Sequence, residues 1–275
     1  MISRAVVATV ASLLLFTQAF GQDLIFTAPP REKPAQGAKL YGPLAAHFSK
    51  VLKTKVVYQH PGNWLNYQRG MRNGKYDIVF DGPHFAAWRM AHLKHDMLVK
   101  LPGTLVFYLL GKKGDASVKN TNDLIGQKIC GISPPNLSTL SILDHYRNPV
   151  RQPVIKGVRG GMGGVYKTFM KGASCKALVL RNTFYKKKLT DEKRAGLNLI
   201  YESRPLPNQV ISAGPRISNI DKGKLAKSLI SGPGAKAALP VAKRFGGKKA
   251  KGFIYADNKE YEGHNMLLEG VIFGW

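Results

Sequence analysis

The stretch RGMRNGKYDIVFDGP, residues 69–83, contains the pattern on which the fold prediction rests. Its first part closes a helix-like segment, 63–72, that ends at an Asn-Gly pair, a common signal for a helix C-terminus. A buried strand is predicted over 76–80, and Pro83 then opens another helix, since proline suits the first helical turn. A strand set between two helices is typical of an α/β fold.

The same alternation continues on both sides of that stretch. Upstream, two strands enclose a helix over 38–52, whose start we place near Gly42-Pro43. Downstream, a long apolar strand over 104–111 and a short helical turn over 121–124 precede further elements. These are strands over 128–132, 154–158, 176–180, 198–202 and 208–213, and helices over 137–146, 164–171, 222–231 and 261–271. The order predicts an α/β fold with mixed, mostly parallel sheets.

Composition agrees with a globular chain that carries an unusual charge. The 275 residues are 44% hydrophobic, which is enough for a core and excludes a disordered or fibrous protein. Lys and Arg number 42 against 16 acids, a formal net charge of +26, so the surface should attract anions or acidic partners. The densest basic runs, 186–188 and 243–251, have two interpretations: a solvated face, or a docking surface for an acidic partner or anionic headgroups.

The N-terminus indicates export. Arg4 precedes an uncharged apolar run, 5–16, and Ala19-Phe20-Gly21 fits a small-x-small cleavage site. The run is too short to span a membrane, and it lacks the polar face of an amphipathic first helix. We therefore expect a signal peptide over 1–21, cleaved near Gly21, and a soluble protein located in the periplasm of a Gram-negative cell. Nucleic acid is scarce there, so we expect no nucleic-acid partner.

Cys130 and Cys175 are the two cysteines of the chain, and both lie in strand-like segments. In an oxidising compartment such a pair often forms a disulfide, and the alternative is two small buried thiols. The pair has no zinc-ligand spacing, and the common phosphate-loop, zinc-protease and serine-hydrolase motifs are absent. The sequence therefore predicts a protein that is not an enzyme, with no metal site and no cofactor.

The order of these segments resembles the phosphate/phosphite/phosphonate-type periplasmic substrate-binding proteins of ABC transporters. The resemblance rests on LIFTAPP at 24–30, LAAHF at 44–48, the stretch 69–83 and DLIGQK at 123–128. It implies a type II periplasmic binding protein with two α/β lobes and a ligand held between them. Lobe 1 is then formed by 22–104 and 212–275, lobe 2 by 105–211, and hinge strands by 104–110 and 208–213.

Candidate ligand-binding residues follow the predicted strands, because ligands of open α/β sheets sit beyond the strands' carboxyl ends, where helix N-termini favour anions. The set is Asp81, His84, Ser138, Thr139, Ser141, Gly161, Gly163 and, by its match to a family position, Tyr58. Each has a structural alternative: the hydroxyls cap a helix, His84 satisfies a backbone group, and the aromatic ring packs in the core. Asp81 would accept a proton from an oxyanion or hold an ammonium group.

Two departures from the family pattern make the predicted pocket less polar. Leucines interrupt the serine/threonine run at 137–141, and Met162 stands where the family often has a histidine. The ligand is thus either a phosphonate-like oxyanion or a larger, partly aromatic molecule. We expect a monomeric solute-binding protein that delivers a small anionic solute to an inner-membrane ABC permease. The alternative is a transport-free partner protein of the same fold, which docks an acidic redox protein through its basic surface.

Overall fold

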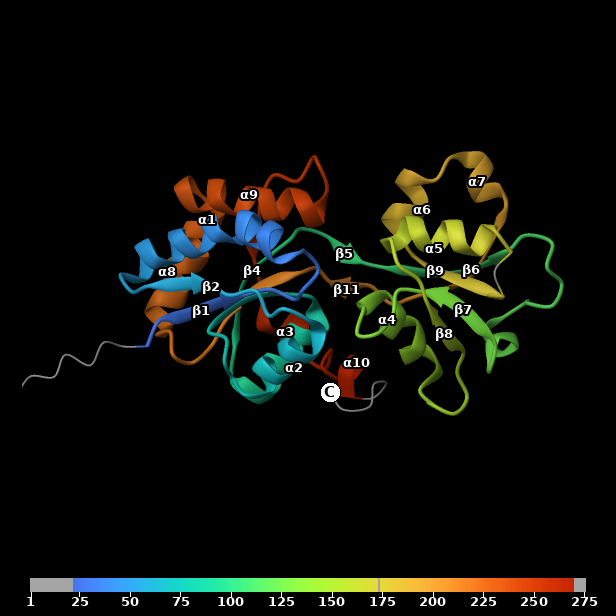
Figure 1. Cartoon of the computed structure of the whole chain (residues 1–275), viewed down its shortest axis with the longest axis horizontal. Helices are drawn as coiled ribbons and strands as arrows, with labels where there is room; N and C mark the ends of the chain where they lie inside the picture. Colours follow the sequence, from blue (N-terminus) through green and yellow to red (C-terminus); the bar gives the residue numbers. More distant parts are fainter. Residues whose placement is uncertain (1–21, 173, 270–275) are drawn as a thin grey trace, which may run out of the picture.

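Two separate sheets organise the chain, and each forms the centre of one α/β lobe (Figure 1). The computed structural model describes residues 22–172 and 174–269, so the predicted signal peptide lies outside the described residues. The first sheet has the order β13-β4-β12-β3-β1-β2, and the second has the order β10-β6-β9-β7-β8. In that described part of the chain, no helix is both long and apolar enough to cross a membrane.

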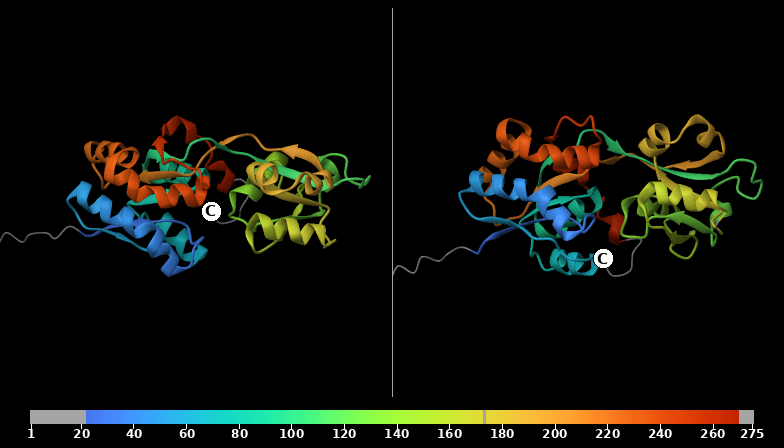
Figure 2. Two further views of the ribbon diagram at one scale, coloured as in Figure 1. Left: turned by 90° about the horizontal axis from the view of Figure 1, so that it is seen from above. Right: turned by 45° about the horizontal axis from the view of Figure 1, so that its top comes forward.

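The first lobe packs helices on both faces of its six-stranded sheet (Figure 2). Its strands are β1 (Leu24–Thr27), β2 (Val56–Tyr58), β3 (Ile78–Asp81), β4 (Asp96–Lys100), β12 (Val210–Ala213) and β13 (Ile254–Tyr255). One face is covered by α1 (Pro34–Leu52), α8 (Asn219–Ile230) and α9 (Gly232–Gly246), and the other by α2 (Trp64–Arg72) and α3 (Pro83–Leu93). β1 is parallel to β2 and β3, whereas the pairs on the other side of β3 are antiparallel.

The second lobe is smaller and follows the same plan. Its strands are β6 (Phe107–Lys112), β7 (Lys128–Gly131), β8 (Val154–Gly157), β9 (Ala177–Arg181) and β10 (Leu197–Glu202). Its helical elements are η1 (Thr121–Leu124), α4 (Leu137–Tyr146), α5 (Gly161–Met170), α6 (Asn182–Lys188) and α7 (Asp191–Ala195). β7 is parallel to β8 and β9, and β6 is antiparallel to both of its neighbours. Both sheets are mixed, and each of their parallel strands leads into a helix.

The lobes are joined by two short strands, β5 (Thr104–Leu105) and β11 (Leu206–Pro207), which pair antiparallel. The sequence predicts these crossings at 104–110 and 208–213. The first prediction merges β5 with β6, and the second is displaced: β12 is fully buried between β3 and β4, inside the first sheet. Pro207 pairs with Thr104 in β5, and a residue without a backbone N–H fits such a two-stranded ribbon better than the centre of a sheet.

Helix predictions fail where glycine and proline dominate the sequence. α1 begins at Pro34 and contains Pro43, whereas its start was predicted near Pro43. α9 was not predicted, because the segment GPGAKAALPVAKRFG has a helix breaker inside it. Its buried face of Gly234, Ala238, Val241 and Ala242 packs against α1 and α8, and this burial outweighs the weak local propensity.

The sequence predicts a C-terminal helix over 261–271, and within the described residues only 266–269 of this range are α-helical. The structure has a short turn, η2 (Asn258–Tyr261), and then α10 (Met266–Glu269). α10 contacts α3 of the first lobe and α4 of the second. Leu267 is fully buried in a core of the second lobe, and Leu268 is fully buried among first-lobe aromatic side chains. The segment therefore makes a third link between the lobes.

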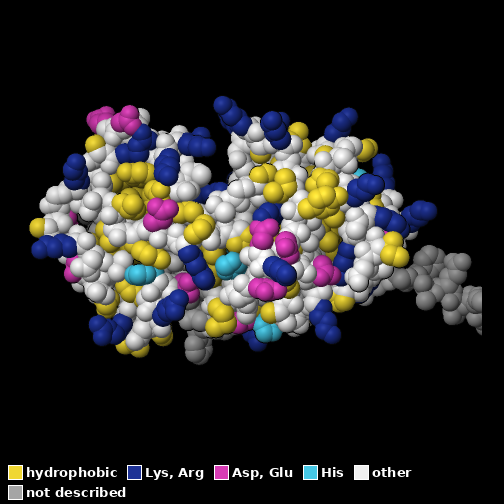
Figure 3. Space-filling model, turned by 180° about the vertical axis from the view of Figure 1, so that it is seen from behind, with side chains coloured by type: hydrophobic (Ala, Val, Ile, Leu, Met, Phe, Trp, Pro, Cys, Tyr) yellow, Lys and Arg dark blue, Asp and Glu magenta, His cyan; other side chains and the backbone are white. Residues whose placement is uncertain are grey.

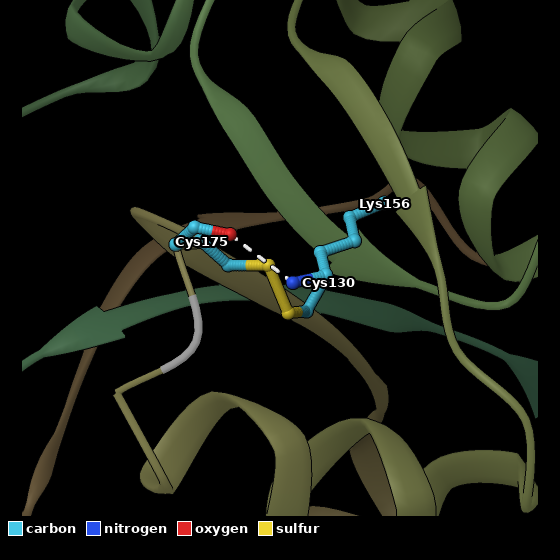
Figure 4. The surroundings of a disulfide bond; sticks show 4 residues. Cys130, Lys156 and Cys175 are labelled. Carbon is cyan, nitrogen blue, oxygen red and sulfur yellow. Dashed lines mark hydrogen bonds between the residues drawn. A yellow bond between two sulfur atoms is a disulfide. The ribbon is translucent and has the colours of Figure 1, made fainter.

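A disulfide joins Cys130 in β7 to Cys175, which lies just before β9 (Figure 4). The two Cα atoms are 5.6 Å apart, and Lys156 on β8 lies opposite Cys130 in the sheet. Because the two cysteines are separated by 45 positions, the bond closes a long loop within the second lobe.

Removing this disulfide should destabilise the second lobe. The bond stabilises the protein because it reduces the chain entropy of the unfolded state. For a separation of 45 positions, its removal should lower the free energy of unfolding by about 4 kcal/mol. Chemical denaturation of the oxidised protein and of the double variant Cys130→Ala/Cys175→Ala would measure it. A reductant should lower the free energy of unfolding of the wild type and leave that of the variant unchanged. Equal stability of the oxidised wild type and the variant would contradict the prediction.

Candidate functional site

A cavity of about 320 Å³ lies between the lobes and takes its lining from both. On the first lobe, Arg31 follows β1, Trp64 starts α2, and Gly82 and His84 follow β3. These positions are the carboxyl ends of the strands, where open α/β sheets bind their ligands. The cavity volume is in the range of small-molecule sites.

The second lobe contributes the corresponding ends of its own strands. Pro135 and Asn136 follow β7, Gly161 and Met162 start α5, and Arg181 ends β9. The N-termini of α4 and α5 therefore lie at the cavity, and their backbone N–H groups and helix dipoles favour a negative charge there. The two lobes present equivalent edges of their sheets to the same space.

Apolar side chains form much of the remaining wall. Three aromatic rings, those of Trp64, Phe85 and Phe245, come from the first lobe, and Phe107 comes from β6 at the start of the second. The rings of Trp64 and Phe85 are stacked with centroids 6.1 Å apart. The site thus combines charged groups with a wall that suits a hydrocarbon or aromatic part of a ligand.

Three arginines carry the charge of the cavity. Arg244 is 3.2 Å from the carboxylate of Glu32, and its guanidinium and that of Arg31 lie over the ring of Phe245. Arg31 and Arg181 have no carboxylate partner within the described residues. Arg31 Nη1 and Arg181 Nε are buried without a hydrogen-bond partner. Because burying an unpaired donor is costly, these groups suit an acceptor that enters the cavity.

Burial also lowers the pKa of Arg181 from its ordinary value, although arginine stays charged at any physiological pH. Each lobe therefore brings one guanidinium to the cavity that no carboxylate of the described chain neutralises.

His84 spans the boundary between the lobes and is almost completely buried. Its Nε2 lies 3.0 Å from the carbonyl oxygen of Pro135, so Nε2 carries the proton and donates it. Burial is the largest effect on the pKa of His84 and lowers it; the hydrogen bond to Pro135 opposes this shift, and the nearby Arg31 and His264 add to it. The resulting pKa of about 3 keeps the ring neutral. Nδ1 of this ring is a buried acceptor without a partner.

Asp81 does not line the cavity, in contrast to the expectation from sequence. Its fully buried carboxylate accepts from Arg89 Nε at 2.8 Å and from the hydroxyl of Tyr67. Arg89 Nη2 also donates to Tyr67, 3.1 Å away. Burial alone would lower the pKa of Arg89, but Tyr67 and Asp81 raise it above the ordinary value. This cluster fixes α2, β3 and α3 to one another directly behind Gly82 and His84.

The three predicted hydroxyls lie in the first turns of α4 but donate to groups of their own segment. Ser138 donates to the side chain of Asn136, and Thr139 donates to the carbonyl of Ile132. Ser141 donates to the carbonyl four residues earlier. All three are buried, and the cavity is lined by Asn136 and Leu137 in their place.

Tyr58 and Gly163 also lie away from the cavity. Tyr58 packs between Phe26 and Tyr41 in the core of the first lobe. Gly163 borders a separate groove between α5 and α6, next to Tyr166. Of the residues predicted from sequence, the structure brings only His84 and Gly161 to the cavity wall.

Sequence reasoning missed the charged residues of the site. Arg31 and Arg181 each stand close behind a predicted buried strand, at positions where the chain turns from the strand toward a helix. A cation at such a position was an available signal. The sequence around Gln209 and Arg244 does not indicate a binding role. Gln209 reaches the cavity next to the hinge, and Arg244 reaches it through α9, a helix that the sequence did not predict.

No group of three or more His, Cys, Asp or Glu side chains within residues 22–172 and 174–269 could hold a metal ion. The groups available in the cavity are guanidinium donors, backbone N–H groups, side-chain amides, a neutral imidazole and aromatic rings.

The fold and the interlobe cavity define a two-lobed solute-binding protein of the type II periplasmic class. The model of the family described as the periplasmic substrate-binding protein of phosphonate ABC transporters matches residues 26–261. The chain belongs to this family, whose members are periplasmic, bind a small solute, work with an ABC permease and are not enzymes. None of the curated proteins matches the chain.

Solved structures with this fold are similar over nearly the whole chain. XAC2383 from Xanthomonas citri, bound to ATP, has a TM-score of 0.69 at 14% identity, covering 91% of this chain and 97% of its own. PhnD1 from Prochlorococcus marinus, in complex with methylphosphonate, has a TM-score of 0.61 at 15% identity, covering 89% and 96%. PA3383 from Pseudomonas aeruginosa, a binding protein component of an ABC phosphonate transporter, has a TM-score of 0.56 at 13% identity, covering 86% of this chain and 82% of its own. At these identities the likeness establishes the fold alone.

The variant Asp81→Ala should lose about 3–5 kcal/mol in the free energy of unfolding, because it leaves the Arg89 cation buried without its partner. The double variant Asp81→Leu/Arg89→Met should recover most of that loss. Asp23→Ala, which removes an exposed ion pair with Lys55, is the matched control and should cost less than about 1 kcal/mol. Urea denaturation measures all three, and similar losses for Asp81→Ala and Asp23→Ala would contradict the prediction.

Proposed function

We propose that this protein binds a small organic anion in the interlobe cavity and presents it to an ABC permease. The observation that carries the proposal is the pair of guanidinium groups, Arg31 and Arg181, that face the cavity from opposite lobes without a carboxylate partner within the described residues. Charged hydrogen bonds of guanidinium to phosphonate, phosphate or carboxylate are among the strongest in proteins.

An anion between these groups also gives a reason for the lobes to close on it. In the empty protein, Arg31 and Arg181 repel each other more as the lobes approach. A bound anion attracts both guanidinium groups, offsets their repulsion and is held best in the closed form, so it shifts the hinge equilibrium by its differential contacts. The hinge consists of two short paired strands, which favours such a movement.

The walls suggest that the anion has an apolar part. Phe85, Phe245 and Trp64 offer ring faces within the same cavity, and Met162 offers a flexible thioether. A phosphonate or phosphate ester with a hydrocarbon or aryl substituent would use both the charged and the apolar surfaces. Inorganic phosphate would use the charged groups alone and should bind more weakly.

The alternative function is docking of an acidic redox protein through the basic surface. Figure 3 shows Lys and Arg spread over both lobes of one face, with acidic side chains between them, rather than gathered in one patch. Buried, unpartnered donors inside a cavity are not needed for such docking, and they favour solute binding as the main function. We propose that the protein acts as a monomer.

Binding should depend on the two arginines. Isothermal titration calorimetry with phenylphosphonate, methylphosphonate and inorganic phosphate would measure affinity for wild type, Arg31→Gln and Arg181→Gln. Each variant should bind about 10- to 100-fold more weakly, since each loses hydrogen bonds from a charged donor.

Lys187→Gln, an exposed change of the same charge, is the matched control and should bind as the wild type does. Thermal unfolding of each free protein checks that the variants fold. An Arg181→Gln variant with unchanged affinity would contradict the proposed site, and wild-type protein that binds no anion of the series would contradict the function.

A further inference from the structure

The cavity wall contains acceptors as well as cationic donors. A fully ionised oxyanion has no proton to donate to these acceptors. Two buried acceptor atoms, His84 Nδ1 and Gln209 Oε1, belong to residues of the cavity wall and have no hydrogen-bond partner in the structure. An unpaired buried acceptor is as costly as an unpaired donor. The donors and the acceptors together thus describe the ligand more closely than positive charge alone does.

The protonation of His84 follows from its hydrogen bond. A carbonyl oxygen can only accept, so the contact with Pro135 places the proton on Nε2 and leaves a lone pair on Nδ1. Arg31 and His264 are the charged or titratable groups that face the ring. Burial lowers the pKa of both His84 and His264, so neither ring gains a proton near neutral pH.

Nδ1 is directed toward the part of the wall that Gly82 and Arg31 form. A methyl group on Gly82 would lie 2.9 Å from His84 Cε1, 3.1 Å from Nδ1 and 3.7 Å from Arg31 Nη2. A side chain at position 82 would therefore displace the imidazole. His84 Nδ1, a neutral acceptor, and Arg31 Nη2, a cationic donor, therefore lie beside the same backbone position.

We propose that His84 Nδ1 is a specificity-determining acceptor that selects an oxyanion retaining one proton, such as a hydrogen phosphonate or hydrogen phosphate ester. This inference rests on the proposed function and deepens it. The ligand's P–OH group donates to Nδ1, while its ionised oxygens accept from Arg31 and Arg181. An anion that carries no proton, such as a sulfonate, places an oxygen lone pair against the lone pair of Nδ1 and is rejected.

The test compares ligands of equal shape and charge that differ by one proton. Phenylphosphonate and methylphosphonate as monoanions are matched to benzenesulfonate and methanesulfonate, and calorimetry measures each from about pH 6.5 to 8.5, where both histidines stay neutral. The phosphonates should bind roughly 10- to 100-fold more tightly than the sulfonates, as expected for one hydrogen bond to a charged ligand.

The pH dependence separates this inference from recognition by arginines alone. As the second phosphonate proton leaves, its affinity should fall, by up to about tenfold per pH unit for one linked proton. Recognition by guanidinium charge alone predicts the opposite, since the dianion is attracted more strongly. Sulfonate affinity should stay constant throughout. Phosphonate affinity that rises with pH, or equals that of the sulfonates, overturns the inference and leaves the proposed function intact.

Two variants of His84 control for a structural role. In His84→Gln the side-chain amide reaches the Pro135 carbonyl but offers no acceptor at the Nδ1 position, so the preference for phosphonate over sulfonate should be lost. In His84→Asn an acceptor stands near that position while the Pro135 contact is lost, so the preference should persist in a less stable protein. The reverse pattern overturns the inference. Absence of binding by either ligand class in the wild type overturns the proposed function itself.

Discussion

The buried ion pair between Asp81 and Arg89 is the interaction on which the geometry of the first lobe depends. Both side chains are fully buried, and Tyr67 joins them, so the carboxylate at the end of β3 is tied to α3 and α2 at once. Breaking such a pair leaves a bare charge in the core, which costs far more than losing a surface pair. Because Gly82 and His84 directly follow Asp81, the pair also fixes the edge of the cavity.

In the second lobe, different interactions hold the cavity-lining residues in place. A disulfide holds β7 to the segment before β9. The loop that follows β7 brings Pro135 to the cavity, and β9 ends there at Arg181. The lobes contact through β5 and β11, through His84 and Pro135, and through α10 with its pair of buried leucines. Movement between the lobes must therefore keep the hinge ribbon while it changes the contacts around α10 and His84.

Charge has two separate roles in this protein. The formal net charge of the sequence is +26, and solvent and salt screen the Lys and Arg side chains that are exposed on both lobes. Inside the cavity, by contrast, the few buried polar groups that remain unpaired act at short range. Long-range attraction raises the local concentration of anions. In the proposed function, the donors and acceptors of the cavity wall select among those anions.

Local sequence determined the elements of this fold wherever a periodic apolar pattern had clear ends. The helix over Trp64–Arg72 has Asn63 as its cap, and α4 has the predicted bounds, because both signals are local. The order of those elements was enough to indicate the family. For α9, local sequence failed, because its glycines and prolines argue against a helix. Burial against α1 and α8 stabilises this helix in spite of its weak local propensity.

Only the tertiary structure decided which side chains meet in the cavity. Arg31 and Arg181 are 150 positions apart in sequence, and nothing local to either shows that both face one space without a carboxylate. The hydroxyls of α4 and the carboxylate of Asp81 looked equally suitable, but nearer partners within their own lobe already satisfy them. A binding group is one that folding leaves without a partner, and the pairing of polar groups depends on contacts between distant parts of the chain.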